Sequence, residues 1–417
     1  MRRLVVLALA LVLLGAPAKA QVTLALSCGA VGTEFELCRE GAEEWARRTG
    51  NRIRMVSMPA GGSERLALLQ QLLASRSANL DVIQADVVWP GILANHLLDL
   101  SGRVETEGHF PTILANNTVD GRLLAVPWFT NTGLLYYRRD LLERHGRRVP
   151  ETWAELTETA EAVMQAERAA GSERMWGYVF QARAYEGLTV NALEWLAAHG
   201  AGTVVEPDGR ISVDNPRAAQ AISRAAGWVA AIAPQGVLNY TEEEARGVFQ
   251  SGQAVFMRNW PYASPLLDAP DSPVRGQVGV TRLPRTEHGP HAAGLGGENL
   301  AVSRYTAHPE AAVDLIRHLT SRAEQRRRAI AAGLPPTYPD LYEDAEMIAA
   351  QPLLRDIARA VPDAVPRPSA ATGVRYNRVS AEFANAVHAV LSGRLDAAES
   401  LERLEARLQR VSRGGAW

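Results

Sequence analysis

The chain has 417 residues, of which 47% are hydrophobic, and its 44 basic and 46 acidic residues give a formal net charge of −2. This length and composition allow roughly two to three globular domains with substantial cores. The nearly balanced charge gives no electrostatic basis for binding nucleic acid, and we expect no nucleic-acid partner.

The first twenty residues, MRRLVVLALALVLLGAPAKA, combine a basic start, a short apolar run and the sequence Ala18-Lys19-Ala20. This order is typical of a secretory signal peptide that is cleaved near Ala20. The apolar run is too short to cross a bilayer as a helix, and no cysteine follows it directly, so we expect no lipid anchor. We therefore predict a periplasmic protein that begins near Gln21.

Two cysteines, Cys28 and Cys38, lie close together in the sequence. Export permits a disulfide between them, because a predicted strand ends at the first and the next predicted helix carries the second. Two free thiols are the alternative. The sequence contains no CxxC motif or Cys/His cluster of the kind that binds metal, and we expect neither a metal nor a cofactor.

Strand-like and helix-like segments alternate from residue 22 onward. VTLALS, RIRMVSM and LDVIQAD read as strands, and residues 33–50 and 63–76 read as helices. Such alternation predicts an α/β fold with a mostly parallel sheet flanked by helices. Ligands of these sheets bind at the carboxyl ends of the strands, where Glu34 and Asp86 fall. The alternatives are a favourable helix-dipole contact for Glu34 and a helix cap for Asp86.

The rest of the chain continues with helical patterns, two further strand-like segments and one long helix. The helical patterns cover residues 149–167, 187–200, 215–232 and 241–252. Residues 253–260 and 296–305 read as strands, and residues 309–333 read as a single helix. We expect Arg326 to Arg328 to lie on the solvated face of that helix.

Aromatic residues recur beside glycine or proline and beside side chains that form hydrogen bonds. They occur in PWFTNTG, AYEGL and RNWPYA, and near GLGGEN. Sugars suit this mixture, because their apolar faces pack on rings and their hydroxyls bond to carboxylates, amides and guanidinium groups. Glycine lets the backbone approach such a ligand closely. Taken alone, Trp128 would be a typical core residue.

Five segments together resemble the extracellular solute-binding proteins of ABC sugar importers, and the nearest group is the trehalose/maltose-binding type of the maltose-binding-protein class. The segments are PWFTNTGLLYYRRDLL, NALEWLAAHG, TEEEARGVFQSGQAVFMRNWPYA, GLGGENLAVS and RPSAATGVRYNRVS. They occur in the family's order over nearly the whole chain after residue 20.

This resemblance implies a two-lobed periplasmic-binding-protein fold. Each lobe would be a mostly parallel sheet flanked by helices, with three segments crossing between the lobes. We expect the N-terminal lobe at residues 21–130 and 298–345, and the C-terminal lobe at residues 131–297 and 346–417. The family further implies a monomer that passes its solute to the transmembrane permease subunits of an ABC importer.

The resemblance also implies a small sugar in the cleft, either an α-glucoside such as trehalose, maltose or sucrose, or glucose. It assigns ligand contacts to Glu34, Asp86, Trp128, Asn131, Glu186, Trp260, Tyr262, Gly296, Gly297, Glu298 and Arg367. Two positions depart from the family's pattern. Asn131 stands where the family usually has Asp, which removes a charge-assisted hydrogen bond, and Glu298 replaces a frequent Trp, which exchanges an aromatic surface for a carboxylate.

Several rival functions fit parts of the sequence. The acidic residues Glu34, Asp86 and Glu186 could form a glycosidase site, but the sequence has no GxSxG, HExxH or phosphate-loop motif, and we expect no catalysis. The same fold could carry an oligosaccharide, a polyol, a monosaccharide, a polyamine or ferric ion. Iron binding through Tyr136 and Tyr137 conflicts with their alternation along a strand. A purely structural envelope protein would leave the clustered aromatic residues unexplained.

Overall fold

The computed structural model describes residues 21–28, 32–59, 62–414 and 417. The predicted signal peptide lies outside these residues. No helix in the described part of the chain is both long and apolar enough to span a bilayer.

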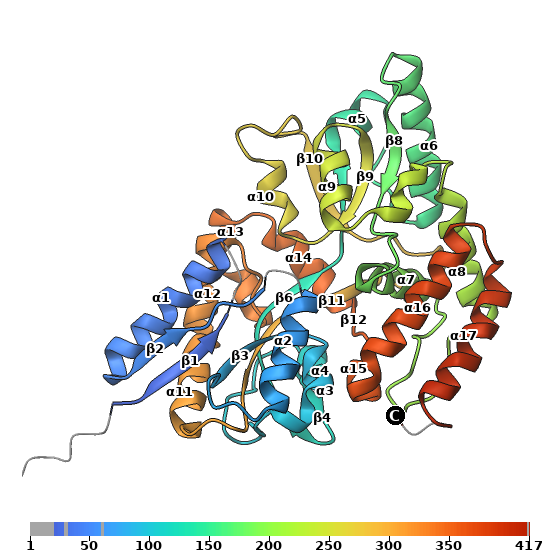
Figure 1. Ribbon diagram of the computed structural model, residues 1–417. Helices are drawn as coiled ribbons and strands as arrows, with labels where there is room; N and C mark the ends of the chain where they lie inside the picture. The colour runs from blue at the N-terminus through green and yellow to red at the C-terminus, as the bar shows by residue number, and fades with distance from the viewer. Residues whose placement is uncertain (1–20, 29–31, 60–61, 415–416) are drawn as a thin grey trace, which may run out of the picture.

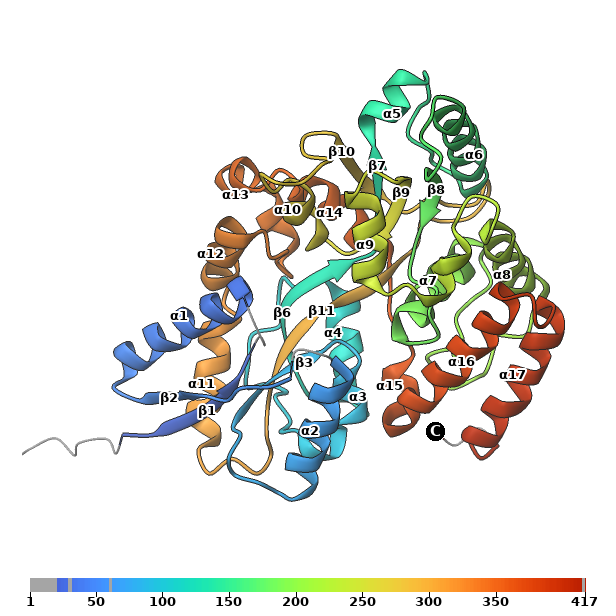
Figure 2. The same cartoon turned by 45° about the horizontal axis from the view of Figure 1, so that its top comes forward.

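Two sheets, each with helices packed against it, form the framework of the molecule (Figures 1 and 2). The first sheet has six strands in the order β12-β11-β3-β1-β2, with β6 paired to β11. Its strands are β1 (Thr23–Ser27), β2 (Arg52–Met55), β3 (Val82–Asp86), β6 (Val126–Thr132), β11 (Ala293–Val302) and β12 (Ala364–Val365). As the alternating pattern predicts, β1 runs parallel to both β2 and β3. By contrast, β11 comes from far along the chain and runs antiparallel to β3 and β6.

Among the described residues, six helices lie near the first sheet, and their buried side chains complete its core. They are α1 (Gly32–Thr49), α2 (Gly62–Ala74), α3 (Trp89–Ile92), α4 (Pro111–Asn117), α11 (Pro309–Leu319) and α12 (Arg322–Ala332). On α1, the buried indole of Trp45 donates a hydrogen bond to Asp314 of α11 over 2.8 Å. Cys28 and Cys38 are joined by a disulfide that ties the end of β1 to α1.

The second sheet has four strands in the order β10-β7-β9-β8. They are β7 (Leu134–Arg138), β8 (Trp176–Val179), β9 (Ala254–Asn259) and β10 (Val278–Arg282). The associated helices are α5 (Arg139–Arg144), α6 (Trp153–Ala169), α7 (Glu186–Ala198), α8 (Pro216–Trp228), α9 (Glu242–Gln250), α10 (Ala263–Leu267), α16 (Tyr376–Leu391) and α17 (Ala397–Val411).

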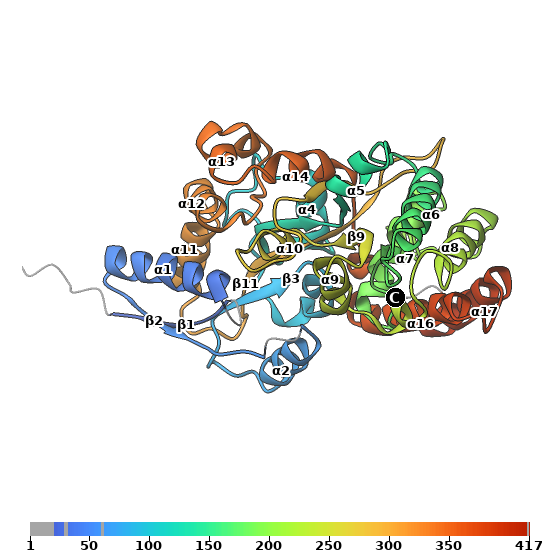
Figure 3. The same ribbon diagram turned by 90° about the horizontal axis from the view of Figure 1, so that it is seen from above.

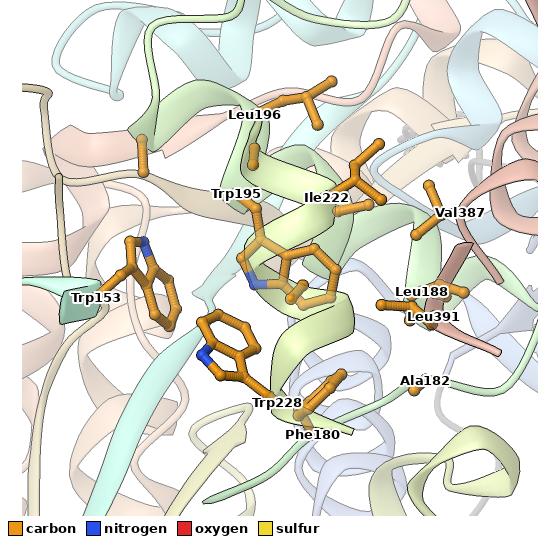
Figure 4. Close-up of a cluster of buried hydrophobic side chains, with 14 of the residues drawn as sticks. Trp153, Phe180, Ala182, Leu188, Trp195, Leu196, Ile222, Trp228, Val387 and Leu391 are labelled. Atoms are coloured by element: carbon orange, nitrogen blue, oxygen red, sulfur yellow. The ribbon is translucent and has the colours of Figure 1, made fainter. Parts of the chain in front are cut away.

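Large aromatic side chains fill the core around the second sheet (Figure 4). The rings of Trp195 and Trp228 meet at 80° with their centroids 5.7 Å apart, and Phe180 meets Trp195 at 84° and 5.6 Å. Edge-to-face contacts of this kind stabilise a core beyond simple burial of area. Trp195 lies near the carboxyl end of α7, so this cluster packs that helix into the core.

The remaining elements are short. They are β4 (Thr118–Val119), β5 (Arg122–Leu123), α13 (Ala345–Ala350), α14 (Leu354–Ala360), α15 (Ser369–Thr372) and 3-10 helices at Ala94–His96, Gln235–Asn239, Pro339–Glu343, Val361–Asp363 and Gly373–Arg375. Figure 3 shows α11, α12, α13 and α14 following one another from the side of α1 to the second sheet, where α14 packs on β10.

Within the described residues, three parts of the chain pass between the two sheets. Strand β6 leads directly into β7, with only Gly133 between them, and β11 returns the chain from β10 to the first sheet. The third passage surrounds β12, which pairs with the start of β11 at Ala293 and Gly294.

Two expectations about residues 309–333 are wrong. The segment forms two helices because the side chain of Ser321 accepts a hydrogen bond from the backbone N–H of Glu324 and so begins α12 as a new helix. Arg328 does not face solvent. Its guanidinium is buried, donates to the carbonyl oxygen of Trp128 over 2.8 Å and stacks on the indole ring of Trp128.

The disulfide yields a direct stability test. It closes a loop between residues separated by 10 positions, which restricts the unfolded chain and stabilises the fold by about 2–3 kcal/mol. We expect the double variant Cys28→Ser/Cys38→Ser to lose a free energy of unfolding of this size in urea titrations. Wild-type protein unfolded under reducing conditions is the matched control and should behave like the variant. Equal stability of oxidised wild type and variant would contradict this expectation.

Candidate functional site

A cavity of about 390 Å³ lies where the two sheets face each other across the connecting strands. It is lined by Glu34, Asp86, Phe129, Asn131, Tyr185, Glu186, Gly187, Val190, Glu242, Trp260, Tyr262, Gly296, Gly297, Glu298 and Arg367. The first sheet contributes the end of β3, the start of α1 and parts of β6 and β11. The second contributes the amino ends of α7 and α9 and the segment that follows β9. Residues far apart in the sequence therefore converge on one site.

Arg367 connects the two sides of the cavity. Its side chain is only 4% exposed, and its guanidinium donates to Glu186 over 2.7 Å and to Asp86 over 3.3 Å. Burial by itself opposes the charge, but the two carboxylates outweigh burial and raise the pKa of Arg367 further above its usual range. Glu186 also accepts hydrogen bonds from Tyr376 and Ser380. The cation is thus fixed between the end of β3 and the start of α7.

Glu298 is an unusual carboxyl group in this wall. One of its oxygens, Oε1, accepts from Arg65 over 2.9 Å, while Oε2 is buried without a hydrogen-bond partner among the described residues. Burial raises the pKa of Glu298 to about 8; Arg65 opposes the shift, and the nearby Asp86 and Glu34 add to it. Burial also raises the pKa of Glu34, although the Gln84 side chain donates to Glu34 over 2.6 Å and opposes that change.

The aromatic part of the wall comes from the segment after β9. The indole of Trp260 donates to Glu242 over 3.4 Å, and Tyr185 donates to the same carboxylate over 2.6 Å. Tyr262 is 41% exposed at the cavity mouth, so its ring is open to a ligand. Aromatic rings and carboxylates therefore both line the cavity.

Glycines in β11 are required by close packing. A Cβ atom at Gly296 would come within 2.8 Å of the Trp260 ring, and one at Gly297 would come within 2.4 Å of the carbonyl oxygen of Phe129. Gly297 also has a φ of +116°, which side-chain-bearing residues rarely adopt. The double glycine thus lets the crossing strand approach both the aromatic wall and β6.

Comparison with known proteins decides the family. The family described as bacterial extracellular solute-binding protein matches residues 30–326. The chain belongs to this family. A probable ABC transporter-binding protein of Deinococcus radiodurans is 44% identical over 400 residues, covering 95% of each chain. The family resemblance predicted from the sequence is confirmed, and the extracellular nature of the family agrees with export.

Solved structures confirm the two-lobed fold. The maltose-bound MalE3 protein of T. maritima is 36% identical, with a TM-score of 0.83, and the match covers 94% of this chain and all of that one (100%). A cyclic α-maltosyl-1,6-maltose binding protein from Arthrobacter globiformis has a TM-score of 0.80 at 22% identity, covering 95% of this chain and 100% of that one. The second likeness supports the fold alone. The chain is thus a solute-binding protein with a mixed α/β, two-lobed architecture.

Of the residues that the sequence assigned to the ligand, Trp128 is misplaced and all the others line the cavity. The Trp128 side chain is 0% exposed and packs in the core around the first sheet. Side chains alternate along a strand, so Phe129 and Asn131 of β6 face the cavity while Trp128 and Thr130 point the other way. This alternation is the signal in the sequence that could have assigned the ligand contact to Phe129 instead of Trp128.

The sequence also missed four further lining residues, namely Tyr185, Gly187, Val190 and Glu242. Tyr185 stood in one of the aromatic segments, next to Glu186. Glu242 gave no separate signal, because three acidic residues fill the first turn of α9 and any of them suits a helix amino end. Within the described residues, no group of three or more His, Cys, Asp or Glu side chains is arranged to hold a metal ion.

The raised pKa of Glu298 predicts a pH-dependent stability. A carboxyl whose pKa is about 8 in the folded protein but 4.5 in the unfolded chain stabilises the fold fully below pH 4.5 and loses that contribution as pH rises to about 8. We expect Glu298→Gln, which cannot ionise, to become more stable relative to wild type between pH 5 and pH 8.5. The slope should be at most about 1.4 kcal/mol per pH unit.

Urea unfolding at several pH values measures this difference. Glu64→Gln, on an exposed residue of α2, is the matched control and should show no such trend. A constant difference between Glu298→Gln and wild type across the pH range would contradict the proposed burial of an ionisable carboxyl.

Proposed function

We propose that this protein captures a small sugar and delivers it to the transmembrane permease subunits of an ABC importer. The favoured ligand is an α-glucoside such as trehalose, maltose or sucrose, or glucose itself. The observation that carries the proposal is the cavity of about 390 Å³, which is lined by aromatic rings, carboxylates, an amide and a guanidinium. A pyranose offers the complementary pattern of apolar faces and a hydroxyl rim.

The proposed lobes follow the sequence. The N-terminal lobe would comprise residues 21–130 and 298–345, and the C-terminal lobe residues 131–297 and 346–417. In this arrangement Asp86 and Glu186 belong to different lobes, so a sugar bound to both carboxylates would bridge them. The protein would work as a periplasmic monomer, after removal of the signal peptide near Ala20.

Capture requires that the ligand favours a closed arrangement of the lobes. A ligand shifts such an equilibrium only by as much as it binds one state better than the other. In the open state a sugar would bond to one lobe, and in the closed state it would gain partners from the second. The permease would then recognise the closed, loaded form.

One relative and two residues of the pocket bear on the identity of the sugar. The MalE3 structure, at 36% identity, contains maltose, which supports an α-linked glucose disaccharide. Asn131 and Glu298 distinguish this pocket from the family's usual pattern. The side chain of Glu298 is 14% exposed and places a carboxyl rather than an aromatic ring at that corner, which favours a sugar hydroxyl over an apolar sugar face there.

A second candidate ligand is a longer oligosaccharide. A larger cavity of about 940 Å³ adjoins the first and shares four lining residues with it, namely Glu34, Phe129, Asn131 and Tyr262. Its other walls come from α10, β10 and the segments around α12 to α14. This volume could hold sugar units that extend beyond the inner cavity.

Titration calorimetry of sugar-stripped protein tests the proposal. We expect dissociation constants of about 1 µM or lower for at least one of trehalose, maltose, sucrose, palatinose and glucose, which corresponds to about −8 kcal/mol. Maltotetraose included in the panel tests the second candidate, because tighter binding of the longer chain requires the outer cavity. Absence of binding across the whole panel would contradict a sugar function.

Catalysis is not part of the proposal. The three carboxylates of the glycosidase alternative already have partners: Arg367 at Asp86 and Glu186, and Gln84 at Glu34. Incubation with a chromogenic α-glucoside should therefore release no chromophore beyond the spontaneous rate. Release that scales with protein concentration would favour the glycosidase alternative.

A further inference from the structure

Glu194 and Arg258 form an ion pair deep beneath the cavity. Their side chains are 0% and 1% exposed, and neither is among the described residues that line the cavity. Arg258 meets the carboxylate with two nitrogens: Nε donates to Oε2 over 3.0 Å, and Nη2 donates to Oε1. A third nitrogen, Nη1, lies 3.4 Å from the side-chain oxygen of Gln181. Glu194 lies on α7 and Arg258 on β9, so the pair joins a helix and a strand of one lobe.

The same pair contacts two of the segments that pass between the sheets. Glu194 Oε1 accepts a hydrogen bond from the backbone N–H of Gly294 in β11 over 2.9 Å. A Cβ atom at Gly133, the residue between β6 and β7, would lie 2.3 Å from that carboxylate oxygen and 2.5 Å from Nη2 of Arg258. The absence of a side chain at Gly133 therefore lets the backbone of this crossing segment pack directly on the ion pair.

Arg258 also supports the aromatic wall. Its guanidinium carbon lies 4.2 Å from the centroid of the Trp260 ring, within the range of a cation–π contact. Trp260 lines the cavity, and its ring packs so closely on Gly296 that a Cβ there would come within 2.8 Å. The indole is thus held between a buried guanidinium and the backbone of β11.

A buried ion pair is weak evidence for added stability, because removing both charges from water offsets most of their attraction. The neighbours of the Glu194–Arg258 pair explain why apolar residues could not take its place. The N–H of Gly294 needs an acceptor at this depth, and a buried amide left without one costs about 1–3 kcal/mol. The planar guanidinium can pair with a carboxylate and stack on an indole at the same time. The carboxylate thus fixes the position of Gly294, and the guanidinium fixes the position of the Trp260 ring.

We propose that Glu194 and Arg258 are positioning residues for ligand binding, which fix the Trp260 ring against the crossing strands and so set the affinity without touching the ligand. The inference rests on the proposed function for the identity of the ligand, which is a sugar. The contacts among Glu194, Arg258 and Trp260 do not depend on that function. It predicts that Arg258 and Trp260 act on binding as one unit.

A double-mutant cycle tests this prediction. Arg258→Met, Trp260→Leu and the double variant are compared by calorimetry with the sugar that wild type binds most tightly in the panel. We expect each single variant to lose roughly tenfold or more in affinity, and the double variant to bind about as weakly as Trp260→Leu, because contacting residues are not additive. If the double variant instead lost affinity by the product of the two single losses, the proposal would be overturned. Arg326→Met, which removes a peripheral ion pair with Asp344, is the control and should keep wild-type affinity.

Two further measurements keep the test decisive. Arg258→Lys retains the charge without the two-pronged pairing, so it should fold and still lose affinity if position is what matters; wild-type affinity in this variant would count against the proposal. Hydrogen exchange of the ligand-free protein should become faster in β11 and in the β6–β7 connection for Arg258→Met, but not for Arg326→Met. This readout needs no sugar, so unchanged exchange would overturn the inference even if wild type bound nothing in the panel.

Discussion

The burial of the Arg367 guanidinium is the constraint on which the cavity depends. A cation that is almost fully withdrawn from water must be paired, and a buried charge left without partners is strongly destabilising. Arg367 finds its partners in Asp86, at the end of β3, and Glu186, at the start of α7. Asp86 ends a strand of the first sheet, and Glu186 begins a helix of the core around the second sheet, so satisfying one charge brings both parts to the same point. The backbone carbonyl of Leu295 in β11, 3.4 Å away, completes the contact.

The same principle orders the rest of the site. Gln84 fixes Glu34, Arg65 fixes Glu298, and the pair of Tyr185 and Trp260 fixes Glu242. Side chains held in this way lose little conformational freedom when a ligand arrives, which lowers the cost of binding.

The sequence predicted the parts that depend on local pattern or on family likeness. The alternation of strands and helices gave the parallel pairing of β1, β2 and β3, and the resemblance placed residues as distant as Glu34 and Arg367 in one cavity. The sequence could not predict the orientation of Trp128, because that depends on the register of β6 on β11. Nor could it predict the burial of Arg328, because that depends on packing between α12 and β6. The pairing of Glu194 with Arg258 joins residues 64 positions apart and becomes visible only once α7 and β9 are placed.

Capture of a sugar between two lobes is the central claim, and small-angle X-ray scattering tests it most directly. The radius of gyration is measured for sugar-free protein, for protein saturated with its tightest ligand, and for protein with the same concentration of a sugar that does not bind. The account predicts a smaller radius of gyration with the bound ligand only. An unchanged radius at demonstrated saturation would contradict closure and would leave the cavity as a rigid site.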